Sequence, residues 1–224
     1  MSIIPNFPDD LLDLHHHWHV PSSHPGSGPG RVHPPGSPGG GLEFLQFHRD
    51  FVVTFHAWYD AQPFADQVAV APWSEVPAEL KMSGAGWTQG WADAETRLQT
   101  NNPAFNSADE LGTFIELGIH NMFLHGAAAF VYHEPVVGTF HSPLSTYFNG
   151  IHGLVDLWWQ QWETQHLPNL VGRDLLRTLA TRLLGGTALA PSDSRPVDPW
   201  GPRFNSLTYN RTNLIVEDIK RLQR

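Results

Sequence analysis

The chain has 224 residues and no cysteine. This absence excludes disulfides, zinc ribbons, iron–sulfur clusters and thiol catalysis, so any metal site must use imidazole and carboxylate ligands. Basic residues are also few: 13 Lys and Arg stand against 22 Asp and Glu, which gives a formal net charge of -9. Such a balance offers no electrostatic attraction to nucleic acid or to an anionic membrane. We therefore expect a small molecule or another protein as the partner.

Long apolar runs are missing as well. The first ten residues, MSIIPNFPDD, carry neither a positive segment nor an apolar run, and we expect that no later stretch approaches membrane-spanning length. We expect a cytoplasmic protein without a signal peptide and without a membrane partner. The length fits one domain over residues 1–224, with a core at 7–184 and a Pro-rich tail with a short helix at 185–224.

Histidine and tryptophan, by contrast, are abundant. The chain has 14 histidines and 9 tryptophans, and 4 of the histidines lie in the segment LHHHWH at residues 14–19. Histidine at this density is the one compositional indication of metal chemistry. Composition alone does not separate a ligand cluster from a polar loop, so the positions of the histidines must decide.

Apolar periodicity predicts a mainly α protein with long irregular loops and little strand. Helices are expected at residues 7–19, 42–59, from Ser107 past His125, and at 150–165, 170–184 and 212–223. The third of these begins with a capping box formed by Ser107 and Glu110. The Pro- and Gly-rich stretch 20–41 predicts an unusually long loop. The stretch 63–106 has no pattern that assigns it to a helix or a strand.

Three of the expected buried helices carry histidines on or near an apolar face, namely His48, the pair His120 and His125, and His152. A single histidine of this kind is more often a hydrogen-bonded core residue than a metal ligand. Four together are costly to desolvate unless they coordinate an ion or form hydrogen bonds. Imidazole without thiolate suits copper or zinc, and six histidines in two groups of three suit a copper pair.

FLQFHRDFVVTFHAWY (44–59) is similar to the first copper-binding segment of the family of tyrosinases, catechol oxidases and molluscan haemocyanins. IELGIHNMFLHG (115–126) resembles the start of the second copper-binding segment, and SPLSTYFNGIHGLVDLWWQQW (142–162) resembles its end. The resemblance implies an antiparallel four-helix bundle around a dinuclear copper site, with two copper ions as cofactor and O2 as co-substrate.

The resemblance also implies the metal ligands. His120, His125 and His152 would hold one copper, and His48 would be the third ligand of the other. By family spacing, the first two ligands of that copper are His17 and His33. The alternatives in the same region are His15, His16, His19 and His24. Successive helix residues point roughly 100° apart, so residues 15 to 17 do not all face one metal.

The spacing of His120 and His125 is irregular for a shared site. In an α-helix a step of five residues rotates a side chain by roughly 140°, against roughly 40° for a step of four. We predict a π-bulge or a helix break between Asn121 and Leu124, which restores a common face. The alternative is that His125 caps the helix end and that His133 or His141 binds the metal instead. His56, two helical turns beyond His48, is expected to be structural.

Further site residues follow from the resemblance. Phe148 matches the aromatic residue that stacks over the substrate ring, and Asn149 and Gly150 stand where relatives often carry bulkier residues, which implies a wide mouth. Glu116 and Asn121 match a pair that holds a water for the phenolic proton. A phenol with a pKa of about 10 needs such a base. The alternative for Glu116 is a solvated carboxylate on a helix surface.

Arg49 and Asp156 match a buried pair that fixes helix orientation around the metals. The function implied is a type-3 copper oxidoreductase that uses O2 to hydroxylate phenols or to oxidise catechols or o-aminophenols to quinones or quinone imines. Its partners would be a phenolic or aminophenolic substrate and a copper-loading helper protein. A non-enzymatic relative that binds dioxygen or copper is the alternative. A mononuclear zinc or copper protein using only His120, His125 and His152 is a weaker one.

Overall fold

The computed structural model describes the backbone of residues 3–21 and 30–183, and side chains up to residue 166. This part of the chain is mainly helical, as predicted, and contains no β-strand; one isolated bridge joins Ile3 to Ser145. By its internal contacts the chain divides into two compact units, residues 1–168 and 169–224. The predicted helix at 212–223 and the tail at 185–224 lie outside the described residues.

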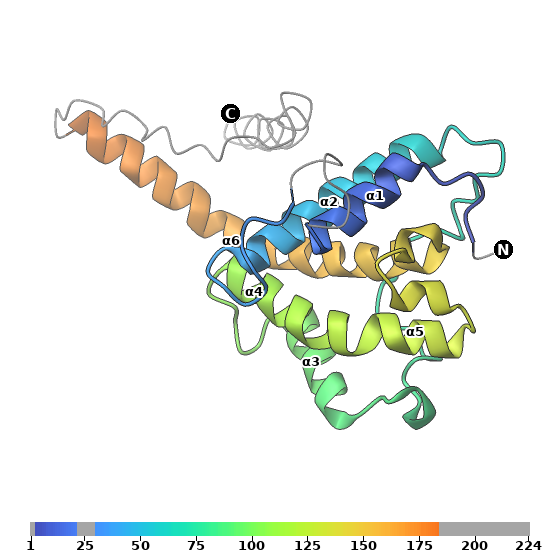
Figure 1. Ribbon diagram of the computed structural model, residues 1–224. Helices are drawn as coiled ribbons and strands as arrows, with labels where there is room; N and C mark the ends of the chain where they lie inside the picture. Colours follow the sequence, from blue (N-terminus) through green and yellow to red (C-terminus); the bar gives the residue numbers. More distant parts are fainter. Residues whose placement is uncertain (1–2, 22–29, 184–224) are drawn as a thin grey trace. The chain divides into compact units, whose positions relative to one another are not determined.

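The described residues form six α-helices (Figure 1): α1 (Asp9–His19), α2 (Gly40–Tyr59), α3 (Gln89–Thr100), α4 (Ala108–Ile115), α5 (His125–Val131) and α6 (Thr146–Leu183). A π-helical segment, η2 (Glu116–Leu124), joins α4 to α5. Three short 3-10 turns, η1 (Ser83–Ala85), η3 (Pro135–Gly138) and η4 (Ser142–Leu144), lie between the others. Helix α3 has no counterpart among the predicted elements.

Helix α6 replaces two predicted helices, at 150–165 and 170–184. Its backbone remains helical through Pro168, where we expected an interruption. A proline inside a helix removes one intrahelical hydrogen bond, and here that loss does not end the helix. The predicted break is therefore wrong.

Two side chains fix where α4 and α2 begin. Ser107 accepts a hydrogen bond from the backbone N–H of Glu110 at 3.1 Å, which confirms the predicted cap of α4. In the first turn of α4, the Asp109 carboxylate accepts hydrogen bonds from the backbone N–H groups of Gly39, Gly41 and Leu42 at 2.9–3.1 Å. A helix begins with N–H groups that lack intrahelical acceptors, so α4 caps the start of α2.

Helices α2 and α4 approach each other at two glycines. A Cβ atom built on Gly112 would lie 2.0 Å from the carbonyl oxygen of Gly41, and one built on Gly41 would lie 2.1 Å from the carbonyl oxygen of Asp109. Only glycine permits this backbone contact. The contact sets the distance between α2, which carries His48, and the η2 segment, which carries His120.

Aromatic side chains hold α1 and α6 against α2. Trp18 of α1 stacks on Phe47 of α2 with ring centroids 4.2 Å apart, and Phe148 of α6 lies edge-on to Phe51 at 5.5 Å. Phe44 is completely buried among these elements. Burial of an aromatic ring of this size contributes on the order of 2–3 kcal/mol, so the core that surrounds the histidines is built to be rigid.

Arg49 joins α2 to α6 on the outer side of this core. Its guanidinium pairs with the carboxylate of Asp156, as expected, and also with Glu163 at 3.1–3.2 Å. It lies 3.4 Å from the ring centroid of Trp159. The Arg49 and Asp156 side chains are 21% and 24% exposed, so the pair is partly and not fully buried.

The stretch Ala108–Val131 corrects an expectation from the sequence. Its 24 residues are long and apolar enough, by length and composition alone, to cross a membrane, whereas we expected no such stretch. Several of its apolar side chains, including Leu111, Ile115 and Ile119, are completely or almost completely buried in the protein core. The same composition is found in core helices of globular folds, so the stretch is weak evidence for a membrane span.

Candidate metal centre

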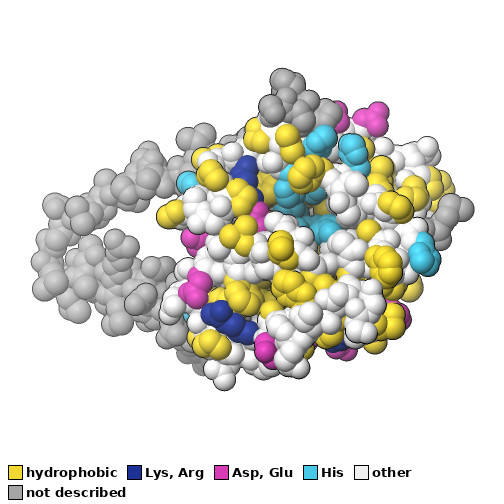
Figure 2. Space-filling view, turned by 60° about the horizontal axis from the view of Figure 1, so that its bottom comes forward, with side chains coloured by type: hydrophobic (Ala, Val, Ile, Leu, Met, Phe, Trp, Pro, Cys, Tyr) yellow, Lys and Arg dark blue, Asp and Glu magenta, His cyan; other side chains and the backbone are white. Residues whose placement is uncertain are grey.

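Two groups of three histidines lie within the fold. The first consists of His15, His19 and His48, and the second of His120, His125 and His152. Within each group the three nitrogen atoms that could bind an ion lie within 4.8 Å of one another. Two histidines of each group are buried, and the third is partly exposed. Figure 2 shows histidine side chains gathered on one face of the molecule, some of them set deep between hydrophobic side chains.

The second group brings three Nε2 atoms together. The Nε2 atom of His120 lies 3.0 Å from that of His152 and 3.1 Å from that of His125. Nitrogens bound to one ion at about 2.0–2.1 Å are roughly 3.0–3.6 Å apart. The three rings therefore have nearly the spacing that a shared metal ion requires.

Hydrogen bonds on the far side of each ring decide which nitrogen carries the proton. Nδ1 of His125 donates to the carbonyl of Val137 at 2.7 Å, and Nδ1 of His152 donates to the carbonyl of Phe148 at 2.9 Å. Nδ1 of His120 lies 2.7 Å from Oδ1 of Asn121. Because these oxygens only accept, Nδ1 holds the hydrogen and Nε2 of the neutral ring presents a lone pair. Three converging lone pairs repel one another unless a cation lies between them.

The rings of this group are neutral. Burial lowers the pKa of His120 and His152 well below the ordinary value, and neighbouring histidines lower it further. Burial lowers the pKa of His125 from 6.5 to about 4, although its hydrogen bond to Val137 opposes the shift. Neutral imidazole is the form that binds a metal ion, so the site is ready for one at neutral pH.

The π-helical segment η2 explains how histidines five residues apart converge. It covers Glu116–Leu124 and therefore includes the predicted interval from Asn121 to Leu124. The segment is longer than a single bulge, and its backbone leaves helical values at Gly118, with φ -99° and ψ -115°. The wider turn of a π-helix places residues five apart nearly above each other. The prediction of a bulge is confirmed, and His125 faces His120 with ring centroids 4.6 Å apart.

The first group is built from α1 and α2. His15 and His19 are four residues apart, so they share one face of α1, which packs against His48 of α2. Nδ1 of His15 donates to the carbonyl of Phe140 at 2.8 Å, and Nδ1 of His48 donates to that of Phe44 at 2.9 Å. Nε2 of His48 is buried without a hydrogen-bond partner. A buried lone pair of this kind fits a metal ion.

The two groups are neighbours. The rings of His48 and His152, one from each group, stack with centroids 4.5 Å apart and planes 12° from parallel. Phe44 packs against both His48 and His120, at 4.6 and 4.9 Å. The geometry therefore provides two adjacent three-imidazole sites and contains no thiolate.

The structure does not bring His17 and His33 to His48. Both point elsewhere: the buried His17 lies beside the loop at Gly30, and His33 is exposed and packs beside Gly39. His17 is two residues from His15, a rotation of roughly 200° on the helix, so it faces away from the site. Their predicted places are taken by His15 and His19. The alternative His24 lies outside the described residues.

His15 and His17 give a direct mutational test of this correction. We expect His15→Ala to remove one of two bound metal ions, because it deletes a ligand whose ring is fixed by Phe140. His17→Ala should retain both ions. Elemental analysis of the two purified variants after metal loading measures the difference. Loss of metal from His17→Ala alone would restore the sequence-based assignment, and retention of both ions by His15→Ala would contradict the structure-based one.

A cavity of about 610 Å³ opens onto both groups. Five of the six histidines line it, all except His48, together with Arg31, Glu116, Asn121 and Phe140 among others. The Phe140 ring is 46% exposed and stacks on His19 at 5.1 Å. This volume lies within the range of cavities that bind small molecules.

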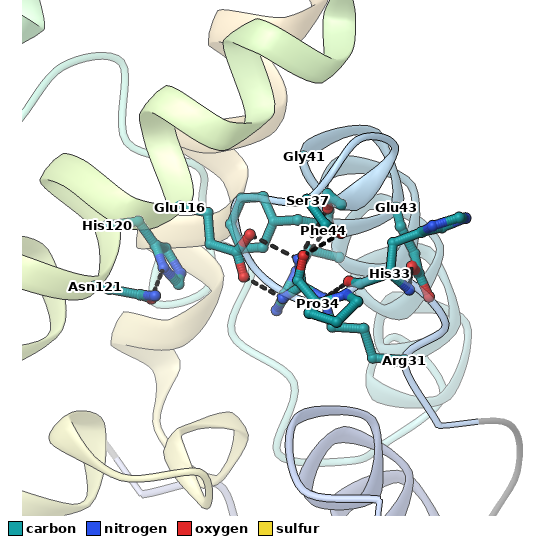
Figure 3. Close-up of polar contacts among 12 residues, drawn as sticks. Arg31, His33, Pro34, Ser37, Gly41, Glu43, Phe44, Glu116, His120 and Asn121 are labelled. Carbon is teal, nitrogen blue, oxygen red and sulfur yellow. Dashed lines mark hydrogen bonds and ion pairs between the residues drawn. The ribbon is translucent and has the colours of Figure 1, made fainter.

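Glu116 and Asn121 both line the cavity, next to the second group. Glu116 is not a solvated surface carboxylate, because it is 1% exposed and forms a two-pronged ion pair with Arg31. Asn121 orients His120 through its side-chain oxygen. Figure 3 shows Glu116 between Arg31 and His120, with its carboxylate directed toward Arg31.

Phe148, Asn149 and Gly150 lie behind the histidines and not at the cavity. Phe148 is completely buried with its ring 3.9 Å from that of His152, and Asn149 is 1% exposed. The space beside Gly150 is filled by the Trp73 indole, whose Nε1 would lie 2.4 Å from a Cβ atom at that position. This placement does not support their predicted contact with substrate or a wide mouth formed by them.

Other residues of the site were not selected from the sequence: His15 and His19 were named only as alternatives, and Arg31 and Phe140 were not named. The four-residue spacing of His15 and His19 is a helix-face signal that could have identified them. Arg31 is the only Asp, Glu, Lys or Arg in the stretch 20–41, which also distinguishes it. No sequence signal marks Phe140, because it acts on His15 through its backbone carbonyl.

The lowered pKa values predict how the metal-free protein responds to acid. Burial lowers the pKa of His15 from 6.5 to about 3, against the opposing effect of its hydrogen bond to Phe140. When the pH falls below 6.5, His15 and His125 take up protons in the unfolded chain but remain neutral in the folded protein, where they are buried. Each of them then lowers the free energy of unfolding by up to about 1.4 kcal/mol per pH unit. For His125 this loss ends near pH 4 and for His15 near pH 3.

Urea denaturation of metal-free protein at pH 7, 6 and 5 measures this loss. The midpoint should fall over the series, mainly below pH 6.5, where surface carboxylates are still ionised. A free energy of unfolding that stays level from pH 7 to pH 5 would mean that the imidazoles are accessible to protons in the folded state.

Comparison with known protein families, with curated proteins and with solved structures finds no match to this chain.

Proposed function

We propose that the protein is a type-3 copper oxidoreductase that uses O2 to oxidise small phenolic compounds, namely phenols, catechols or o-aminophenols. The observation that carries this proposal is the pair of adjacent three-histidine groups on one cavity. Imidazole-only ligation suits copper, and a site with three protein ligands keeps a position open for a small molecule. The similarity of three sequence segments to tyrosinases, catechol oxidases and haemocyanins supports the same assignment.

In this proposal the four elements around the histidines act as an antiparallel bundle that holds a dinuclear centre. Helix α1 supplies His15 and His19, α2 supplies His48, the α4–η2–α5 unit supplies His120 and His125, and α6 supplies His152. Arg49 and Asp156 hold α2 against α6. When bound, two copper ions would bind O2 and would accept the two electrons that a catechol releases on oxidation.

The chain itself binds and orients the substrate. The cavity has room for a single-ring substrate, and Phe140, which lines it and is partly exposed, offers an aromatic surface. Glu116 is the only carboxylate among the residues that line the cavity. Both its oxygens accept from Arg31, and each oxygen retains a further lone pair. Glu116 therefore accepts a hydrogen bond from a water, and this water takes up the phenolic proton.

Oxygen consumption tests the proposal. Copper-loaded protein should consume O2 when catechol or o-aminophenol is added, and a colour from the quinone or quinone imine should appear at the same rate. Metal-free protein and His120→Ala serve as controls without turnover. Loaded protein that binds copper but consumes no O2 with either substrate would contradict an enzyme and favour a carrier of dioxygen or copper.

A further inference from the structure

We propose that Arg31 is a positioning residue that keeps the Glu116 carboxylate away from the ion held by His120, His125 and His152. This inference rests on the part of the proposed function that places a metal ion in the second group. It does not depend on which reaction the protein catalyses.

Arg31 is held from several sides. Its guanidinium pairs with Glu116 through two nitrogens, one contact measuring 2.8 Å, and the two side chains are only 7% and 2% exposed. Nη2 also donates to the carbonyl of Gly40 at 2.9 Å, and Nε donates to that of His33 (Figure 3). The Trp18 ring lies 4.8 Å from the guanidinium carbon. The guanidinium is therefore fixed in place before any ligand arrives.

Glu116 would otherwise compete with the histidines. It lies four residues before His120, at the start of η2, and both side chains line the same cavity. A buried carboxylate without a partner destabilises the folded state, so its side chain would turn toward the nearest positive charge. Carboxylate oxygen is a common ligand of ions that also bind imidazole. With Arg31 removed, the nearest cation would be the ion in the second group.

The direction of the side chain agrees with this role. In Figure 3 the Glu116 carboxylate points toward Arg31 and away from the His120 ring. The ion pair thus leaves the carboxylate beside the cavity, where it can accept a hydrogen bond, but directs it away from the Nε2 atoms. A merely structural role, in which Arg31 only anchors residues 31–40 to η2, predicts no change in the number of metal ligands.

Cobalt substitution separates the two roles. The d–d absorption bands of Co²⁺ respond to the number and type of ligands, so they report an added carboxylate without any need for turnover. We expect Arg31→Gln to shift and weaken these bands, because Glu116 joins the coordination sphere. Glu116→Gln and the double variant Arg31→Gln/Glu116→Gln should retain the wild-type bands. Arg97→Gln, which breaks the Arg97–Glu110 pair, is the matched control and should also match the wild type.

Two results would overturn the inference. One is a wild-type spectrum for Arg31→Gln; the other is a double variant that keeps the altered spectrum of Arg31→Gln. If Arg31→Gln does not fold, Arg31→Met takes its place, because it also removes the partner of Glu116 while it keeps an apolar side chain beside Trp18: altered bands support the inference and wild-type bands overturn it. Absence of Co²⁺ bands from the wild-type protein would overturn both this inference and the proposed metal centre.

Discussion

His152→Ala is expected to lower the copper content from two ions per chain to one and to abolish oxygen consumption. His152 is 2% exposed, and its Nε2 atom lies 3.0 Å from that of His120. Loss of an outer partner of a metal ligand costs about 10- to 100-fold in activity or affinity. Loss of the ligand itself should cost at least about 100-fold, because only two imidazoles then remain for that ion.

His56→Ala is the matched control for this prediction. His56 lies on α2, two turns beyond His48, and its ring approaches Asp60 at 3.7 Å and Phe55 at 5.2 Å, not a second histidine. The variant should keep two copper ions and the activity of the wild type. Retention of both ions by His152→Ala, measured by elemental analysis, would show that the second group does not hold copper.

Gly112→Ala is expected to destabilise the fold and to disturb both metal sites together. The added methyl group would lie 2.0 Å from the Gly41 carbonyl oxygen, so α2 and α4 must move apart. Overpacking of this kind costs about 1–3 kcal/mol, and a clash with backbone atoms, here those of Gly41, belongs to the upper end. The same movement separates His48 on α2 from His120 on η2. Metal affinity should therefore fall together with stability.

Gly126→Ala provides the comparison within the same helical region. A Cβ atom at Gly126 meets nothing within 4 Å, and the residue lies in α5. Alanine favours the helix by up to about 1 kcal/mol over glycine, so this variant should be as stable as the wild type or slightly more stable. Denaturation midpoints of the two metal-free variants measure the difference. A Gly112→Ala midpoint equal to that of Gly126→Ala would mean that the helices can separate without cost.

The parts of the site that follow from local periodicity were predictable. His48, His120 and His152 lie on apolar helix faces, and the five-residue step from His120 to His125 required an irregular turn, which the π-helical segment provides. Helix-face periodicity depends only on neighbours in the sequence, so it can be recognised without knowledge of the fold.

The ligands of the first group were predicted less well, because they were assigned by the spacing in the family and not by the helix face that two of them share. His17 and His33 fit the family spacing, whereas His15 and His19 fit one face of α1. The predicted contact of Phe148 and Gly150 with substrate was not supported for another reason. Whether a residue faces a cavity or the core depends on long-range packing, here on the Trp73 indole that fills the space beside Gly150. No local pattern contains that information.

The proposal depends most on two adjacent ions bound by six histidines from four helical units, namely α1, α2, α4–η2–α5 and α6. A crystal structure of copper-loaded protein, with anomalous scattering measured at the copper absorption edge, tests it most directly. We expect two anomalous peaks, one within about 2.0–2.2 Å of nitrogens of His15, His19 and His48 and the other equally close to nitrogens of His120, His125 and His152. A single peak, or copper bound by His17 or His33 in place of His15 and His19, would contradict it.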